Sequence, residues 1–174
     1  MQRPTTDRER VDFALRTERD GHEFYQMAAK KTAHKLAKAA FELLSREELR
    51  HVALIEALDK GLAGKDKSPE AEEVTLKSLE SSLKSIYGSA SEETGDVKFE
   101  AADAYQKAIE LEKRITSLYT DYMMESDDEG ARRLFAVLQK EEQHHLSLLQ
   151  DMHSYLTKPG EWFVDRDGVM LDGG

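Results

Sequence analysis

Residues 47–51 read Glu-Glu-Leu-Arg-His, and residues 141–145 read Glu-Glu-Gln-His-His. Each stretch holds a glutamate and a histidine three positions apart, Glu48 with His51 and Glu142 with His145. That spacing places both side chains on one face of a helix. The second stretch follows the first by 94 positions. Such a repeat predicts two copies of one helical unit.

The repeat continues through the flanking sequence at the same offset and without a gap. Glu18 matches Glu112, and Tyr25 matches Tyr119. The apolar matches include Ala14 with Ala108, Phe41 with Phe135 and Leu44 with Leu138. A packed core explains the apolar matches, but buried charges are costly unless they are paired or bound to metal. Recurring Glu and His within apolar stripes therefore predict a metal site. The alternative is a bundle in which these residues face solvent or pair with one another.

Apolar residues at steps of three and four predict four long helices, over about residues 7–31, 33–60, 97–124 and 127–156. Short turns within each pair and a long connection between the pairs are typical of ferritin-like bundles. The sequence thus predicts an all-α, ferritin-like four-helix bundle made of two duplicated helical hairpins.

Local signals mark the ends of these helices. Thr6 with Glu9 and Ser126 with Glu129 have the spacing of capping boxes, and Gly61 is a natural stop. Within the crossover of about residues 61–96, Ser68 is expected to cap a short helix. Residues 1–156 are expected to form one domain. Residues 157–174 are expected to form a non-helical tail that packs on the bundle or on a neighbouring subunit.

Composition excludes several classes of protein. The chain has 174 residues and no cysteine, which excludes thiolate catalysis and iron–sulfur clusters within it. A net charge of −10 argues against a nucleic-acid partner. No apolar run approaches the roughly 20 residues of a membrane span, and the charged N-terminus lacks a signal peptide. These features predict a cytoplasmic protein with no membrane contact.

Six residues make up the predicted metal constellation: Glu18, Glu48, His51, Glu112, Glu142 and His145. Di-iron and di-manganese bundles have a characteristic ligand pattern. Two helices each supply one glutamate, and the other two each supply Glu-x-x-His. Oxygen and imidazole ligands suit iron or manganese.

Residues next to the six predicted ligands allow other interpretations. A second register, Glu141 with His144, is disfavoured because its counterpart in the repeat pairs Glu47 with Arg50, and arginine does not bind cations. Glu141 is therefore expected to be exposed or to support a ligand from behind. Tyr25 and Tyr119 either hydrogen-bond a ligand carboxylate or simply fill the core. The unmatched histidines, His34 among them, are expected at the surface.

These segments, from Glu18…Phe24-Tyr25 to Glu141-Glu142-Gln143-His144-His145, resemble the ferritin-like domain of rubrerythrins over about residues 7–156. The resemblance implies a homodimer with two iron ions per site, for which manganese or zinc are possible substitutes. It implies reduction of hydrogen peroxide, or of dioxygen, as the activity. The ligand roles then fall on the six residues of the constellation.

Two departures from the rubrerythrin pattern affect the expected function. The chain lacks the four cysteines of a rubredoxin module, so a separate donor such as a rubredoxin-like protein is expected. Ile115 stands where rubrerythrins usually carry a further glutamate, one turn after Glu112. Two alternatives therefore accompany the peroxidase: a ferroxidase or iron-handling protein, and a non-catalytic helical interaction module with a vestigial metal site.

Overall fold

The structure is a computed structural model, and it describes residues 3–63 and 95–158. Within these ranges the chain forms helices and no strand. The four helices are α1 (Asp7–Lys31), α2 (Lys35–Ala63), α4 (Gly95–Glu125) and α5 (Glu129–Thr157). They contain 25, 29, 31 and 29 residues. The all-α prediction is confirmed, with helix bounds that differ from the predicted ones by a few residues.

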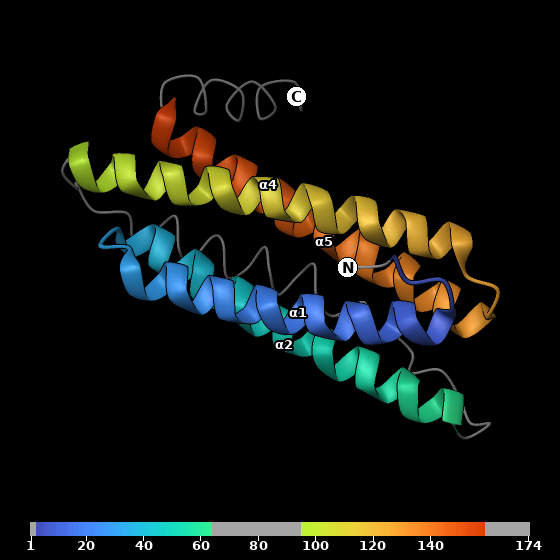
Figure 1. Cartoon of the computed structure of the whole chain (residues 1–174). Coiled ribbons are helices and arrows are strands. Elements are labelled where there is room, and N and C mark those ends of the chain that lie inside the picture. The colour runs from blue at the N-terminus through green and yellow to red at the C-terminus, as the bar shows by residue number, and fades with distance from the viewer. Residues whose placement is uncertain (1–2, 64–94, 159–174) are drawn as a thin grey trace, which may run out of the picture.

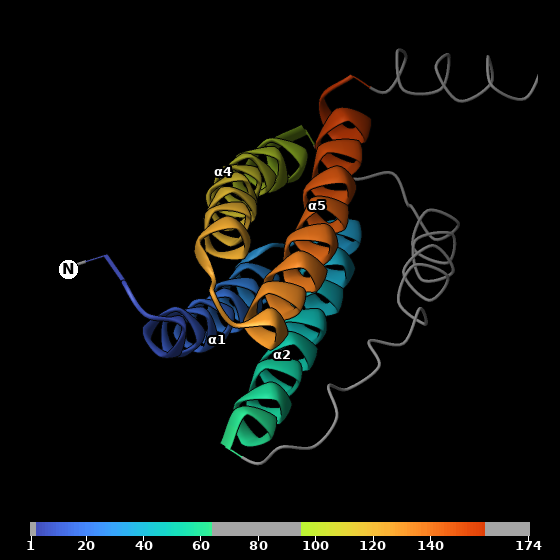
Figure 2. The same cartoon turned by 90° about the vertical axis from the view of Figure 1, so that its right-hand side faces the viewer.

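The helices pack as two antiparallel hairpins, α1 with α2 and α4 with α5 (Figure 1). Between the hairpins, α2 packs against α5 and α1 against α4 (Figure 2). Helix α2 ends at the opposite end of the bundle from the start of α4 (Figure 1). The connection between Ala63 and Gly95 therefore joins opposite ends of the bundle. This is the predicted ferritin-like connectivity of two hairpins joined by a long crossover.

The helix starts show which capping predictions hold. At α1, Thr6 Oγ1 accepts a hydrogen bond from Glu9 N (3.2 Å), and Glu9 Oε2 accepts one from Thr6 N (3.1 Å), so the capping box is confirmed. The second predicted box is wrong. Asp128 caps α5 by accepting from Ala131 N at 2.8 Å. Ser126 is engaged by the preceding helix instead, because its hydroxyl donates to the carbonyl of Tyr122 (2.7 Å).

Two further predictions fail. Helix α2 continues past Gly61 to Ala63, because a helix tolerates one glycine at a modest cost. His34 is 4% exposed rather than at the surface. It lies just before α2, where its Nδ1 accepts a hydrogen bond from Ala37 N (3.2 Å) and satisfies a free donor of the first turn. The predicted helix at Ser68 and the apolar residues of the tail lie outside the described residues.

The core consists of two apolar clusters, one in each half of the bundle. The first includes Tyr25, Phe41, Tyr105 and Leu149. The second includes Val11, Ile55, Tyr119, Phe135 and Leu138. Along every helix, buried polar residues separate the two clusters. None of the four described helices has the length and apolarity that crossing a bilayer requires.

Candidate metal centre

Six charged or titratable side chains converge at the middle of the bundle, between the two apolar clusters. Each is at most 2% exposed, and together they come from all four helices: Glu18, Glu48, His51, Glu112, Glu142 and His145. A helix brings residues three apart onto one face, so Glu48 and His51 point inward from α2, and Glu142 and His145 point inward from α5. The structure therefore brings together all six residues of the predicted constellation.

The six side chains form two groups, each able to hold a metal ion. Glu18, His51 and the pair Glu48 and Glu142 make one group, with ligand atoms within 4.8 Å of one another. Glu112 and His145 make the other group with the same pair. We call Glu48 and Glu142 the shared carboxylates, and Glu18 and Glu112 the outer carboxylates. Two four-ligand groups that share two carboxylates are the arrangement expected of a two-ion site.

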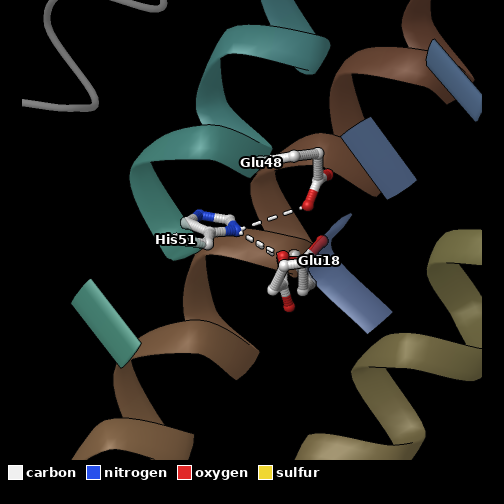
Figure 3. Close-up of side chains that lie close together, drawn as sticks. Glu18, Glu48 and His51 are labelled. Atoms are coloured by element: carbon white, nitrogen blue, oxygen red, sulfur yellow. Dashed lines mark hydrogen bonds and ion pairs between the residues drawn. The ribbon is translucent and has the colours of Figure 1, made fainter. Parts of the chain in front are cut away.

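Both histidines present Nδ1 to the carboxylates. His51 Nδ1 lies 3.0 Å from Glu18 Oε2 and 3.0 Å from Glu142 Oε1. Figure 3 shows Glu18, Glu48 and His51 pointing toward one another. His145 Nδ1 lies 3.2 Å from Glu142 Oε2 and 3.4 Å from Glu48 Oε1. The two imidazole rings stack with centroids 5.3 Å apart. Nδ1 is therefore the atom that each histidine could offer to a cation.

The two repeat-related tyrosines join the hairpins through the outer carboxylates. Tyr25 of α1 donates a hydrogen bond to Glu112 of α4, and Tyr119 of α4 donates one to Glu18 of α1. Both hydroxyls are fully buried, and burial raises both tyrosine pKa values well above the usual range, so they stay protonated donors. Of the two readings of these tyrosines, the structure supports the one in which a phenol orients a carboxylate of the cluster.

Burial and mutual repulsion divide the four carboxylates into two kinds. Burial, followed by the charges of the shared carboxylates, raises the pKa of Glu18 and of Glu112 well above the usual range. Burial also opposes ionisation of the shared carboxylates. Contacts with Glu18 and both histidines nevertheless lower the pKa of Glu48 to about 2. The charges of both histidines hold the pKa of Glu142 well below its usual range.

The histidines respond to the same charges. Burial would lower the pKa of His145, but the charge of Glu142 and contacts with both shared carboxylates raise it to about 10. The charge of Glu142 likewise raises the pKa of His51 well above its usual range against burial. Two imidazolium ions thus balance two carboxylates.

Several buried oxygen atoms of the cluster lack a hydrogen-bond donor. They are both carboxylate oxygens of Glu48, Oε2 of Glu112 and Oε1 of Glu142. Leaving buried acceptors unsatisfied is costly. Cations would satisfy them, and carboxylate oxygen with imidazole nitrogen is a donor set suited to iron or manganese. The residues present therefore fit a metal pair.

A chain of contacts lies behind His51, and the sequence analysis missed the part that Arg50 plays in it. His51 Nε2 lies 2.7 Å from Glu141 Oε2, and Arg50 donates to the same oxygen at 2.6 Å. Arg50 also donates to Glu47 at 3.0 Å. Glu141 thus supports a candidate ligand from behind, which the sequence left as one of two options. The role of Arg50 could have been suspected because Arg50 is the counterpart of His144 in the repeat and is not a histidine.

The residue one turn after Glu112 is also placed clearly. Ile115 is 5% exposed and belongs to the apolar cluster that includes Tyr119 and Phe135. Its side chain cannot bind a cation. The described residues therefore offer six candidate ligands around this centre, and the face of α4 beside it is apolar.

Comparison with known proteins agrees with this geometry. A family model described as Rubrerythrin matches residues 9–153. No curated protein and no solved structure matches the chain. The matched range contains every residue of the candidate metal centre, all of α2 and α4, and all of α1 and α5 except the start of α1 and the end of α5. By this match the chain belongs to the rubrerythrin family.

Proposed function

We propose that the protein is a non-haem di-iron oxidoreductase that reduces hydrogen peroxide with electrons from a separate donor. The observation that carries the proposal is the pair of four-residue groups that share Glu48 and Glu142. In this proposal, Glu18 and His51 complete one ion's ligands, and Glu112 and His145 complete the other's. Manganese or zinc could substitute for iron at these ligands without supporting the same redox chemistry.

An iron pair, when bound, would supply the two electrons that, with two protons, convert one peroxide into two waters. The chain's own residues supply the environment for this reaction. The tyrosines hold the outer carboxylates in place, and Glu141 holds the His51 ring from behind. The apolar clusters on both sides exclude water from the cluster. Such support of ligands typically affects metal affinity and activity strongly.

The electron donor and the assembly are part of the proposal. None of the 174 residues is a cysteine, so no thiolate-bound iron is available within this sequence. We propose that the reducing electrons come from a separate protein of the rubredoxin type. We further propose that the protein is a homodimer. Sedimentation of the metal-loaded protein would test the dimer, and a monomer at micromolar concentration would contradict it.

A second function, oxidation and handling of ferrous iron, is favoured by one observation. Ile115 lies in the apolar cluster beside the centre, where a further carboxylate would otherwise be available for ligand exchange. The six candidate ligands alone are sufficient for a site that oxidises ferrous iron. The two functions differ in oxidant and in turnover, so one kinetic experiment separates them.

The test is anaerobic reconstitution of the metal-free protein with ferrous iron, followed by rapid mixing with peroxide or with dioxygen. The absorption of the oxidised iron pair reports the reaction. Faster oxidation by peroxide, at one peroxide per two irons, would support the peroxidase. Faster oxidation by dioxygen, with continued turnover of added ferrous iron, would support iron handling.

A double variant tests the site itself. Glu48→Ala combined with Glu142→Ala removes both shared carboxylates and should abolish stable binding of two irons. Glu110→Ala, which changes an exposed carboxylate of α4, serves as the matched control and should bind iron like the wild type. Two tightly bound irons in the double variant would refute the assignment of the site.

A further inference from the structure

Gly21 lies in the middle of α1, one turn after Glu18, and is buried. A glycine inside a helix lowers stability relative to alanine, so its presence calls for a reason. A Cβ atom placed at Gly21 would lie 3.3 Å from Cδ, 3.3 Å from Oε2 and 3.5 Å from Cγ of Glu48. The nearest obstacle to a larger residue is therefore a carboxylate of the candidate metal centre.

The carboxylate that Gly21 admits is one of the two shared ones. Glu48 belongs to both four-residue groups, and neither of its oxygens has a hydrogen-bond donor. Its closest cationic neighbours are His145 Nδ1 at 3.4 Å and His51 Nδ1 at 3.6 Å. With no hydrogen bond to anchor it, the carboxylate depends on the surrounding packing for its position. A side chain at position 21 would push it away from α1 by some tenths of an ångström.

The repeat shows that a small residue is not required by the hairpin itself. The counterpart of Gly21, 94 positions later, is Ile115. Ile115 is buried in an apolar cluster, so α4 accommodates a branched side chain at the equivalent place. The two hairpins therefore differ at the position that follows each outer carboxylate. Among the glycines whose surroundings the structure describes, only Gly21 lies against a carboxylate of the centre.

We propose that Gly21 is a positioning residue, whose missing side chain allows Glu48 to lie where both metal ions can share it. The inference rests on the proposed function of the six residues as a two-metal site. It predicts that a single methyl group at position 21 weakens metal binding without destabilising the metal-free bundle.

The experiment compares wild type with Gly21→Ala, both freed of metal and titrated with cobalt(II). Calorimetry measures affinity and stoichiometry, and the visible absorption bands of cobalt(II) report its coordination. We expect the variant to bind at least tenfold more weakly, with altered bands. Its metal-free melting temperature should equal or exceed that of the wild type, because alanine favours the helix. Gly130→Ala, in the first turn of α5, is the matched control and should leave cobalt binding unchanged.

The outcomes separate this inference from the proposed function. A wild type that binds no cobalt would refute the metal site itself. Wild-type affinity, stoichiometry and bands in Gly21→Ala, beside a wild type that binds two ions, would refute the role of Gly21. A metal-free Gly21→Ala that unfolds at a much lower temperature, or does not fold, would show that the glycine serves general packing and would also overturn the inference.

Discussion

Metal binding should release protons, and the number released depends on how many ligand side chains are protonated in the metal-free protein. In the metal-free protein, burial and neighbouring charges raise the pKa values of both outer carboxylates. The neighbouring carboxylates raise the pKa values of both histidines against the effect of burial. We expect each of these four groups to hold a proton at pH 6, while the low pKa values leave the two shared carboxylates ionised. Two imidazolium ions and two carboxylates leave the cluster neutral.

Metal ligands must be deprotonated. Loading two divalent ions therefore displaces two protons from the histidines and two from the outer carboxylates, which makes four protons per pair at pH 6. The cluster stays neutral, because four carboxylates then balance two divalent ions. The assay is calorimetric titration with manganese(II) in two buffers of different ionisation enthalpy, which yields the number of protons released. That number should fall as the pH rises through the raised pKa values.

A matched pair of variants makes the count specific. Glu112→Gln removes one titrating outer carboxylate, and the release should fall from four to three protons for the same loading. Glu110→Gln, an exposed carboxylate two positions earlier on α4, should leave the count at four. Release of two protons or fewer by the wild type at pH 6 would mean that at least two of these four groups carry no proton before metal arrives. That result would refute the charge balance described here.

Three further predictions concern stability and support of the ligands. The free energy of unfolding of the metal-free protein should fall by several kcal/mol between pH 6.5 and 10, because the folded state holds the His145 proton up to a pKa of about 10 and the unfolded chain does not. Urea titrations that showed rising stability over this range would contradict the prediction. Glu141→Gln should weaken manganese(II) binding about 10- to 100-fold in the same calorimetry, because it removes the charge behind His51 Nε2. Glu47→Gln, which loses a contact with Arg50, is the control, and equal losses of affinity in both variants would argue against a specific role of Glu141. Phe135→Ala should cost about 3–5 kcal/mol of unfolding free energy, since its ring is 0% exposed, and a loss below about 1 kcal/mol in urea titrations would show that this cluster is loosely packed.

Much of the site could be predicted because each ligand residue occurs twice, once in each copy of the repeat. An isolated Glu-x-x-His on a helix is common, but a second copy in register, each preceded by a glutamate at the same distance, marks positions that face one another in the bundle. The structure places all six of these residues in one buried cluster. Periodicity likewise predicted the four helices, since a period near 3.6 is a property of the sequence alone.

The errors occurred where one residue had a choice of partners. Ser126 has the residue type and spacing of a helix cap, but the end of α4 engages its hydroxyl, and Asp128 caps α5 instead. His34 is polar and unmatched in the repeat, yet it is buried because its ring satisfies a backbone donor at the start of α2. Sequence patterns do not reveal which of several nearby groups forms a hydrogen bond. That outcome depends on geometry fixed by packing.

The departures from the repeat matter as much as its matches. The matched residues build two equivalent ligand groups, and the tyrosines bond across the hairpins in a reciprocal way. Close to this symmetric cluster, Gly21 pairs with Ile115 in the repeat, and Arg50 pairs with His144.

Both departures lie in the hairpin of α1 and α2. Gly21 makes room on the α1 side for Glu48, and Arg50 secures Glu141 behind His51. Helix α4 supplies only the apolar Ile115 at the place equivalent to Gly21. Two ions bound here would therefore meet the same ligand types in unequal surroundings. Unequal surroundings imply unequal affinities, so the two ions should bind in separable steps rather than as an indistinguishable pair.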